Sequence, residues 1–217
     1  NSPHNPTGSL LTAVDREKLA KLVAGTNIVV LSDEVYEHIL FDGEQHASLC
    51  AHPELAARSI VVSSFGKTYH ITGWKIGYVV GPAALMAEFR KVHQFNVFTV
   101  HTPSQLALAE YMQDAERHLR LAAFYEEKRD FFRQLLAATP FELLPCRGTY
   151  FQLARYDRIS DLPDRAFAEW MTRDVGVAVI PVSVFYANGR DDRVVRFCFA
   201  KQESTLRAAA ERLCKAL

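Results

Sequence analysis

The sequence has 217 residues, of which 49% are apolar and 23% charged, and its 25 basic residues balance its 25 acidic ones. This is the composition of an ordinary globular protein, with room for one large domain or two modest ones. Without a net charge or a long apolar run, neither nucleic acid nor a membrane is expected as a partner.

The first part of the chain alternates helix-like and strand-like segments. Apolar residues recur at helical spacing over residues 12–24. The apolar side of this helix is expected to comprise Val14, Leu19, Leu22 and Val23. Three short apolar runs predict strands at residues 28–31, 59–63 and 76–80. The first shows no alternation, which is typical of a strand buried on both faces. Strands that alternate with helices predict an α/β layer architecture.

Residues 103–138 have a helical pattern, and the character of the chain changes after them. Strand-like runs then occur at residues 141–144, 149–153, 177–182 and 194–199, and helical ones at 163–173 and 204–217. Ser204 is expected to cap the last helix through its hydroxyl. We therefore predict two domains, residues 1–118 and a smaller α+β domain over residues 119–217.

Cysteines and histidines give no sign of a metal or a disulfide framework. Cys50, Cys146, Cys198 and Cys214 are far apart and form no CxxC pair. They are expected to be reduced thiols in a cytoplasmic protein. None of the eight histidines belongs to a metal-binding motif, so no metal is predicted.

Lys67 follows directly after the second predicted strand, at the strand end where open α/β sheets place their ligands. Most lysines are solvated surface charges, which is the simple explanation for any single one. A lysine held among apolar and hydroxyl groups can instead have its ammonium form disfavoured. Its amine can then form a Schiff base.

Asp33 and Tyr36 follow the first predicted strand in the same way. Asp33 could simply cap a following helix. A pyridoxal cofactor needs a carboxylate at its pyridine nitrogen and a hydrogen-bond donor at its ring oxygen, and Asp33 and Tyr36 would supply both. Asn5 lies among turn residues, and its amide could reach the same ring oxygen.

Arg196 lies inside the last apolar strand, where an arginine is unusual unless it is paired. A structural ion pair is one explanation. The alternative is a guanidinium that holds a substrate carboxylate through two parallel hydrogen bonds.

Together these segments resemble class I aminotransferases of fold type I, which use pyridoxal 5'-phosphate (PLP). The resemblance rests on Asn5-Pro6-Thr7-Gly8, Asp33 with Tyr36, Ser64-Phe65-Gly66-Lys67, Gly73-Trp74-Lys75-Ile76-Gly77 and Val195-Arg196-Phe197. These motifs occur in the family's order over essentially the whole chain. The resemblance implies the C-terminal part of an α/β PLP-binding large domain, with a mostly parallel sheet, followed by the smaller α+β domain.

The resemblance also implies roles for single residues. Lys67 would form the internal aldimine and move the proton between the substrate α-carbon and the cofactor. The implied cofactor contacts are Asp33 at the pyridine nitrogen, Tyr36 and Asn5 at the ring oxygen, and Ser64 and Lys75 at the phosphate. Arg196 would bind the substrate α-carboxylate, and Tyr150 would lie at the mouth of the active site.

Lys75 departs from the broad family, where arginine is frequent, and resembles the methionine and kynurenine/glutamine aminotransferase branch. The implied donors are methionine and large neutral or aromatic amino acids, with a 2-oxo acid as acceptor and a homodimeric enzyme. Two alternatives remain open. One is a cysteine-conjugate C–S β-lyase with the same cofactor, and the other is the effector domain of an aminotransferase-like transcription regulator.

The chain begins at Asn1, within a motif. The aromatic residue that stacks on the cofactor, and a loop that grips its phosphate, precede this point in the family. We therefore expect residues 1–217 to be a fragment that is not a competent catalyst alone.

Overall fold

A computed structural model describes residues 1–217 and divides them into two compact units. Unit 1 comprises residues 1–3 and 10–122, and unit 2 comprises residues 4–9 and 123–217. The short N-terminal segment joins unit 2 through its backbone, since Arg147 N–H donates to the Gly8 carbonyl at 3.0 Å. The α/β fold class predicted from the sequence is confirmed. None of the helices combines the length and the apolar character that a membrane crossing requires.

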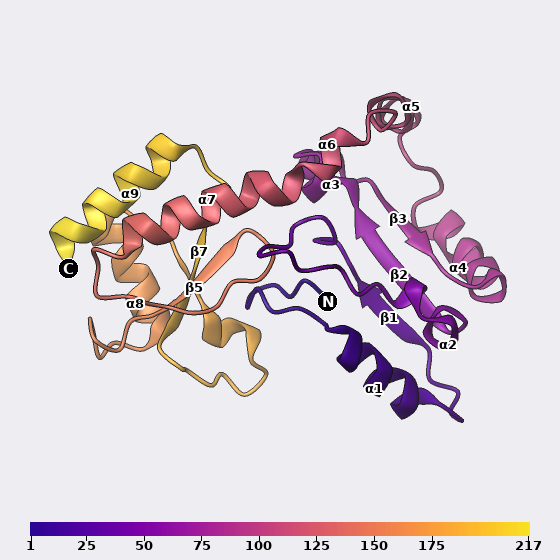
Figure 1. Cartoon of the computed structure of the whole chain (residues 1–217), viewed down its shortest axis with the longest axis horizontal. Coiled ribbons are helices and arrows are strands. Elements are labelled where there is room, and N and C mark those ends of the chain that lie inside the picture. Colours follow the sequence, from indigo (N-terminus) through magenta and orange to yellow (C-terminus); the bar gives the residue numbers. More distant parts are fainter. The chain divides into compact units, whose positions relative to one another are not determined.

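Unit 1 is built around a three-stranded sheet in the order β1-β2-β3 (Figure 1). The strands are β1 (Val30–Asp33), β2 (Ser59–Ser64) and β3 (Gly77–Val80). β1 and β2 are parallel, and β3 runs antiparallel to β2. The helices are α1 (Ala13–Val23), α2 (Pro53–Ala56), α3 (Phe65–Thr68), α4 (Ala83–Asn96), α5 (Thr102–Tyr111) and α6 (Glu116–Leu119), with 3-10 turns η1 (Leu49–Ala51) and η2 (Thr72–Trp74).

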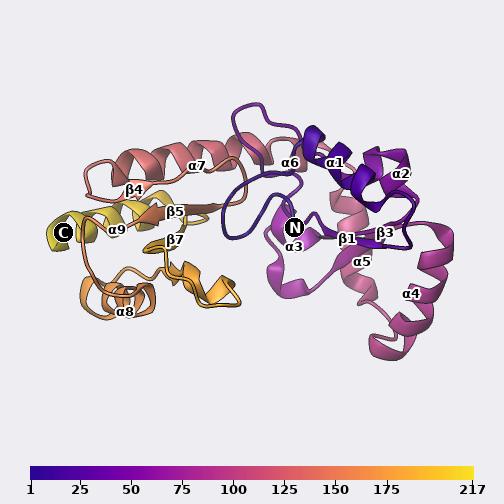
Figure 2. The ribbon, with the colours of Figure 1, turned by 90° about the horizontal axis from the view of Figure 1, so that it is seen from below.

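The core of unit 1 lies on one face of this sheet. Helices α1 and α2 cover that face, while α4 and α5 lie on the other side (Figure 2). The core is formed by Ala20, Val23, Leu49, Leu55 and Val61. Thr12 begins α1 with a capping box, because its hydroxyl accepts from Asp15 N–H while the Asp15 carboxylate accepts from Thr12 N–H.

Two expectations for unit 1 are wrong. Val14 and Leu22 are 63% and 74% exposed, because α1 packs through a narrower stripe that includes Ala20 and Val23. The first strand is not buried on both faces, since Leu31 is 71% exposed. β1 pairs only with β2 and is therefore an edge strand.

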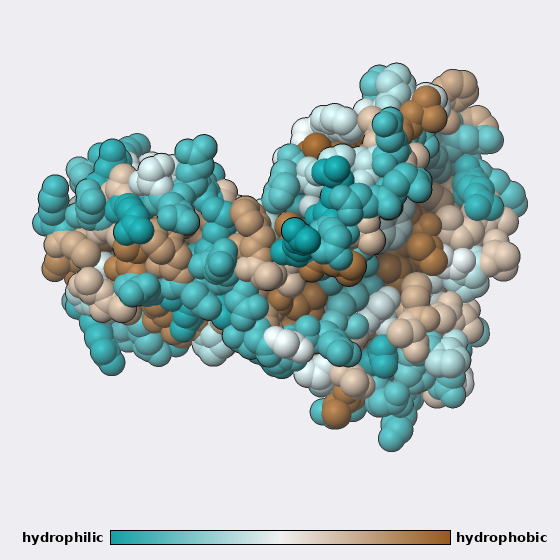
Figure 3. Space-filling view, turned by 45° about the horizontal axis from the view of Figure 1, so that its top comes forward, coloured by the Kyte–Doolittle hydropathy of each residue, from teal (hydrophilic) through white to brown (hydrophobic).

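Helix α4 is not among the elements predicted from the sequence. Its Leu85, Phe89 and Val92 recur at helical spacing, but within residues 1–217 the helix buries none of its residues. Apolar side chains reach the surface in several places on the face drawn in Figure 3. Over the whole chain, the most exposed large apolar side chains are Phe95 and Phe98, both 85% exposed.

Unit 2 is a four-stranded antiparallel sheet in the order β4-β5-β7-β6. The strands are β4 (Glu142–Leu143), β5 (Phe151–Arg155), β6 (Ile180–Pro181) and β7 (Val194–Cys198). The helices are α7 (Leu121–Leu136), α8 (Asp164–Trp170), which continues as a π turn (Met171–Val175), and α9 (Glu203–Ala216), with a 3-10 turn η4 (Val182–Phe185). Helix α9 is capped by Gln202 rather than by Ser204, which lies in its first turn.

The two faces of the unit 2 sheet carry different side chains. Successive residues of a strand point to opposite faces, so Arg196 and Phe197 of β7 face apart. The Phe197 ring packs against the rings of Phe132 and Phe141, at centroid distances of 5.7 and 5.3 Å. Arg196 is paired in register with Leu153 of β5, and both lie on the other face.

Candidate functional site

The predicted site residues of unit 1 collect at one edge of its sheet. The carboxyl ends of β1 and β2 meet there because these strands are parallel, with Asp33 opposite Val62. β3 begins at the same edge because it is antiparallel, with Gly77 opposite Ser64. The pairing therefore brings Asp33, Ser64 and the start of β3 together, with Tyr36, Lys67 and Lys75 on the segments that leave or enter these strands.

Asp33 is the last residue of β1 and its side chain is exposed. One carboxylate oxygen accepts from Val35 N–H at 3.1 Å, which stabilises a turn rather than the helix cap considered from the sequence. A carboxylate has about four lone-pair sites, so this bond leaves most of its acceptor capacity. Tyr36 lies in that turn and is only 3% exposed.

Ser64 ends β2 and caps the single turn α3, where its hydroxyl accepts from Gly66 N–H at 3.1 Å. Lys67 lies in this turn and is half-buried. A side chain at Gly66 would place its Cβ 3.0 Å from the Thr72 Cα. Glycine thus allows the segment after Lys67 to fold back closely against the turn that carries the lysine.

Lys75 precedes β3 in the left-handed backbone conformation, with φ of 57°, and is exposed. Two residues later, a Cβ at Gly77 would lie 2.4 Å from the Ser63 carbonyl oxygen. The strands approach so closely that only glycine fits. This close approach fixes the start of β3, and with it Lys75, beside Ser64.

Unit 1 also contains a hydrogen-bonded cluster around Glu34 and Glu37, which no sequence motif indicates. The buried Glu34 carboxylate accepts from His46 Nε2 at 2.7 Å and from Leu49 N–H at 3.1 Å. Burial raises the pKa of Glu34, but these hydrogen bonds outweigh burial and leave the pKa below its ordinary value. Glu37 accepts from the hydroxyls of Ser63 and Tyr78.

Glu34, Glu37 and His46 each offer a ligand atom, and these atoms lie within 4.8 Å of one another. Their hydrogen bonds join them to one another and to neighbouring groups, so we interpret the cluster as structural. Glu34 and His46 are twelve residues apart in the chain, and no short motif could have revealed their contact.

In unit 2 the structure brings Arg196 and Asn5 together. The Arg196 Nη1 donates to the Asn5 amide oxygen at 2.6 Å. The guanidinium carbon also lies 4.0 Å from the centroid of the Phe151 ring. Both of these partners of the guanidinium, the Asn5 amide and the Phe151 ring, are uncharged.

Tyr150 precedes β5. The centroid of its ring lies 4.7 Å from that of the Phe151 ring and 5.5 Å from that of the Tyr125 ring. Burial, together with the neighbouring Tyr150, raises the pKa of Tyr125 to about 12. The residue before Tyr150, Thr149, is fully buried with φ of 68°. A positive φ is a real outlier for a β-branched residue.

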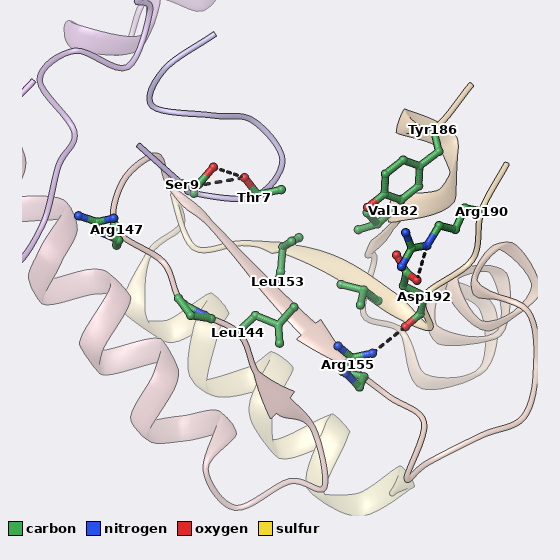
Figure 4. Close-up of a pocket in the computed structure, with 13 residues that line it drawn as sticks. Thr7, Ser9, Leu144, Arg147, Leu153, Arg155, Val182, Tyr186, Arg190 and Asp192 are labelled. Carbon is green, nitrogen blue, oxygen red and sulfur yellow. Dashed lines mark hydrogen bonds and ion pairs between the residues drawn. The ribbon is translucent and has the colours of Figure 1, made fainter. Parts of the chain in front are cut away.

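A pocket of about 450 Å³ lies on the same sheet face as Arg196 (Figure 4). Its floor is apolar and includes Leu153 and Val194. At its rim, Arg190 and Arg155 converge on Asp192, with Arg190 Nε 2.8 Å from the carboxylate and Arg155 Nη1 3.2 Å from the carbonyl oxygen (Figure 4). No sequence motif indicates this pocket, because its walls come from three separate stretches of the chain.

Comparison with known proteins identifies similar chains. The family model described as aminotransferase class I and II matches residues 1–213. Methionine aminotransferase of Escherichia coli K12 is 52% identical over 214 residues, which cover 98% of this chain and 55% of that protein. Kynurenine–oxoglutarate transaminase 1 of Rattus norvegicus is 35% identical, over 99% of this chain and 56% of that protein. The chain thus spans about half the length of these relatives.

Solved structures agree with the sequence comparison. The crystal structure of YbdL from Escherichia coli, identified as a methionine aminotransferase, matches 99% of this chain and 57% of that one. Its TM-score is 0.96 at 51% identity. N-succinyldiaminopimelate aminotransferase from Mycobacterium tuberculosis matches the whole chain and 57% of its own, with a TM-score of 0.92 at 36% identity.

Proposed function

Because this chain belongs to the class I and II aminotransferases, we propose that the protein transfers an amino group to a 2-oxo acid with PLP as cofactor. The observation that carries this proposal is the sheet edge of unit 1. There, Asp33 and Ser64 end neighbouring parallel strands, and Lys67 follows within one turn. The edge supplies a carboxylate, a hydroxyl and an amine within one small region.

The side chains at this edge fit the chemistry of PLP. The exposed Asp33 carboxylate suits the protonated pyridine nitrogen, which is a cation. The exposed Lys75 ammonium suits a phosphate as a positive charge. The Ser64 hydroxyl would donate to the phosphate in place of its long, 3.4 Å hydrogen bond to the Ile76 carbonyl oxygen. Bound PLP supplies an electron sink for the negative charge that develops at the substrate α-carbon.

The protein's residues then hold, orient and move protons. We assign Lys67 as the residue that holds the cofactor through its amine and takes the proton from the substrate α-carbon. Tyr36 and Asn5 are assigned to the ring oxygen as hydrogen-bond donors. Arg196 is assigned to the substrate α-carboxylate, because a planar guanidinium can donate two parallel hydrogen bonds to a planar carboxylate. Tyr150 is assigned to the substrate-binding region.

The proposed donors are methionine and large neutral or aromatic amino acids. This choice is supported by the 52% identity to a methionine aminotransferase and by the Gly73-Trp74-Lys75 segment. A homodimer in the cytoplasm is proposed on the same family grounds. An amino-acid panel with the full-length protein tests the substrate class, and a clear preference for aspartate or alanine would contradict it.

The cofactor assignment is tested by titrating the full-length protein with PLP, followed by borohydride reduction and peptide mapping. We expect a visible absorbance band and a reduced adduct on Lys67. A Lys67→Ala variant should lose the adduct, while Lys91→Ala, which removes an exposed lysine of α4, should keep it. An adduct on another lysine in the wild-type protein would overturn the assignment.

The reaction class is tested with and without an amino acceptor. An aminotransferase needs a 2-oxo acid to complete its cycle, so the 2-oxo acid should be consumed in step with the donor. Release of pyruvate and ammonia from a cysteine conjugate without any acceptor would favour the C–S β-lyase instead.

A further inference from the structure

The Arg196 guanidinium is in contact with two phenylalanine rings. Its central carbon lies 4.0 Å from the centroid of Phe151 and 5.4 Å from that of Phe185. Both distances are within the range of a cation–π interaction. A guanidinium donates hydrogen bonds in its own plane, whereas an aromatic ring stacks on its face. The rings therefore hold the group through its face, while one of its N–H groups, on Nη1, donates to the Asn5 amide oxygen at 2.6 Å.

The Phe151 ring is placed by the backbone before it. Thr149 has φ of 68° and is fully buried, and its hydroxyl accepts from Phe151 N–H at 3.3 Å. Phe151 is itself buried, at 7% exposed, and pairs with Cys198 across the sheet. This ring is part of the core and also forms one support of Arg196.

The Phe185 ring is placed differently, by a short turn fixed to helix α8. Phe185 ends η4, and Ser183 within that turn donates to the Asp164 carboxylate through both its N–H and its hydroxyl, each at 2.7 Å. Asp164 begins α8 and is 2% exposed. The segment after the turn is tied down as well, because Asp164 N–H donates to the Asp191 carboxylate at 2.8 Å.

The Phe185 ring is 45% exposed, so its place beside Arg196 is set by the anchored turn rather than by burial of the ring. We propose that Phe185 is a positioning residue for Arg196. The Phe185 ring fixes the orientation of the Arg196 guanidinium and excludes water from one of its faces. The guanidinium N–H groups are then directed at the carboxylate of an amino acid or a 2-oxo acid.

This inference rests on the proposed function, in which Arg196 binds the substrate carboxylate. It adds Phe185 as a residue on which carboxylate affinity depends, and Asp164 and Ser183 as the residues that hold the turn carrying Phe185. Removal of the ring should weaken the binding of every monocarboxylate in the same proportion, whatever its side chain. The chemical step should change little, because Phe185 has no assigned part in proton transfer.

The test measures carboxylate binding directly in the full-length, PLP-loaded protein. Isothermal titration with 3-phenylpropionate, a carboxylate that has no amino group to donate, gives the dissociation constant for wild type and variants. We expect Phe185→Leu to raise this constant about five-fold, which corresponds to about 1 kcal/mol. Phe185→Tyr keeps an aromatic face and should stay within about two-fold of wild type.

Val184→Ala is the matched control, because Val184 is in the same turn, is 47% exposed, and the truncation removes apolar surface without removing a ring. In steady-state kinetics, Phe185→Leu should raise KM for donor and acceptor alike with kcat within about two-fold. Equal binding by wild type and Phe185→Leu would overturn the inference, as would a loss that Phe185→Tyr does not restore.

The two proposals fail in distinguishable ways. If wild-type protein binds 3-phenylpropionate and Arg196→Lys abolishes this binding, Arg196 binds carboxylates even if no amino acid is ever transaminated. If transamination proceeds but the Phe185 variants bind the carboxylate as wild type does, the proposed function stands and the role of Phe185 is refuted.

Discussion

Replacing Asp164 by alanine should cost unit 2 a large part of its stability. The buried carboxylate accepts two hydrogen bonds from Ser183, at 2.7 Å each. A hydrogen bond to a charged group contributes about 1.5–3 kcal/mol, so the pair contributes about 3–6 kcal/mol. Removing the carboxylate also removes the cost of burying its charge, which brings the expected net loss to about 3 kcal/mol.

Asparagine at the same position should be far milder. Its amide oxygen can still accept from Ser183 N–H, and its amide N–H can donate to the Ser183 hydroxyl oxygen. We expect Asp164→Asn to cost about 1 kcal/mol, and Ser183→Ala, which removes only the hydroxyl, about 1–2 kcal/mol. The double variant Asp164→Ala/Ser183→Ala should cost less than the sum of the single losses, since both remove one shared hydrogen bond.

Denaturant unfolding followed by tryptophan fluorescence provides the measurement. The chain has two tryptophans, Trp74 in unit 1 and Trp170 at the end of α8. In a Trp74→Phe background, Trp170 reports on the helix that Asp164 begins. If Asp164→Ala stayed within about 0.5 kcal/mol of its parent, the anchor would not be a significant source of stability.

Three further outcomes are expected. Gly77→Ala should destabilise unit 1 by about 3 kcal/mol in denaturant titrations, because its Cβ would lie 2.4 Å from the Ser63 carbonyl oxygen, whereas Gly73→Ala, with open space around it, should be nearly neutral. Arg196→Lys should raise KM for amino and 2-oxo acids at least ten-fold in initial-rate assays, since an ammonium cannot form the two parallel bonds; an unchanged KM would exclude Arg196 as the carboxylate ligand. Burial lowers the pKa of His38, with a smaller contribution from His118 and His46 and against the opposing effect of the Glu37 carboxylate. The folded protein therefore binds fewer protons at this site than the unfolded protein, and its stability should fall as the pH drops below about 6.5. Melting curves of His38→Gln should show a smaller loss of stability over the same pH range.

The sequence predicts that Asp33 and Ser64 lie at one sheet edge, because each ends or directly follows a strand that is visible as an apolar run. The second predicted strand, residues 59–63, agrees closely with Ser59–Ser64 in the structure. Once β1 and β2 are parallel neighbours, Asp33 and Ser64 must lie at the same edge. The apolar runs predict the two strands, and the parallel pairing of these strands places their carboxyl ends side by side.

Contacts across long stretches of chain could not be predicted in this way. Glu37 meets Tyr78 from 41 residues away, and Arg196 meets Asn5 from 191 residues away. Neither pair has a periodicity or spacing that marks it, because each depends on how whole elements pack. The Ser204 cap was wrong for a smaller reason: the N-cap position is Gln202, two residues earlier, which is a typical uncertainty at helix ends.

In both units a residue with positive φ comes just before a strand that pairs with a strand carrying a proposed site residue. Lys75 has φ of 57° before β3, and Thr149 has φ of 68° before β5. Such conformations cost of order 1–3 kcal/mol each and persist only where surrounding contacts enforce them. At Thr149 a buried hydrogen bond to Phe151 N–H does so, and the residue that gains a fixed position is the ring beneath Arg196. Glycine would relieve the strain at position 149 but would lose the hydroxyl that holds Phe151 N–H, so the positive φ of Thr149 goes with a fixed ring beneath Arg196.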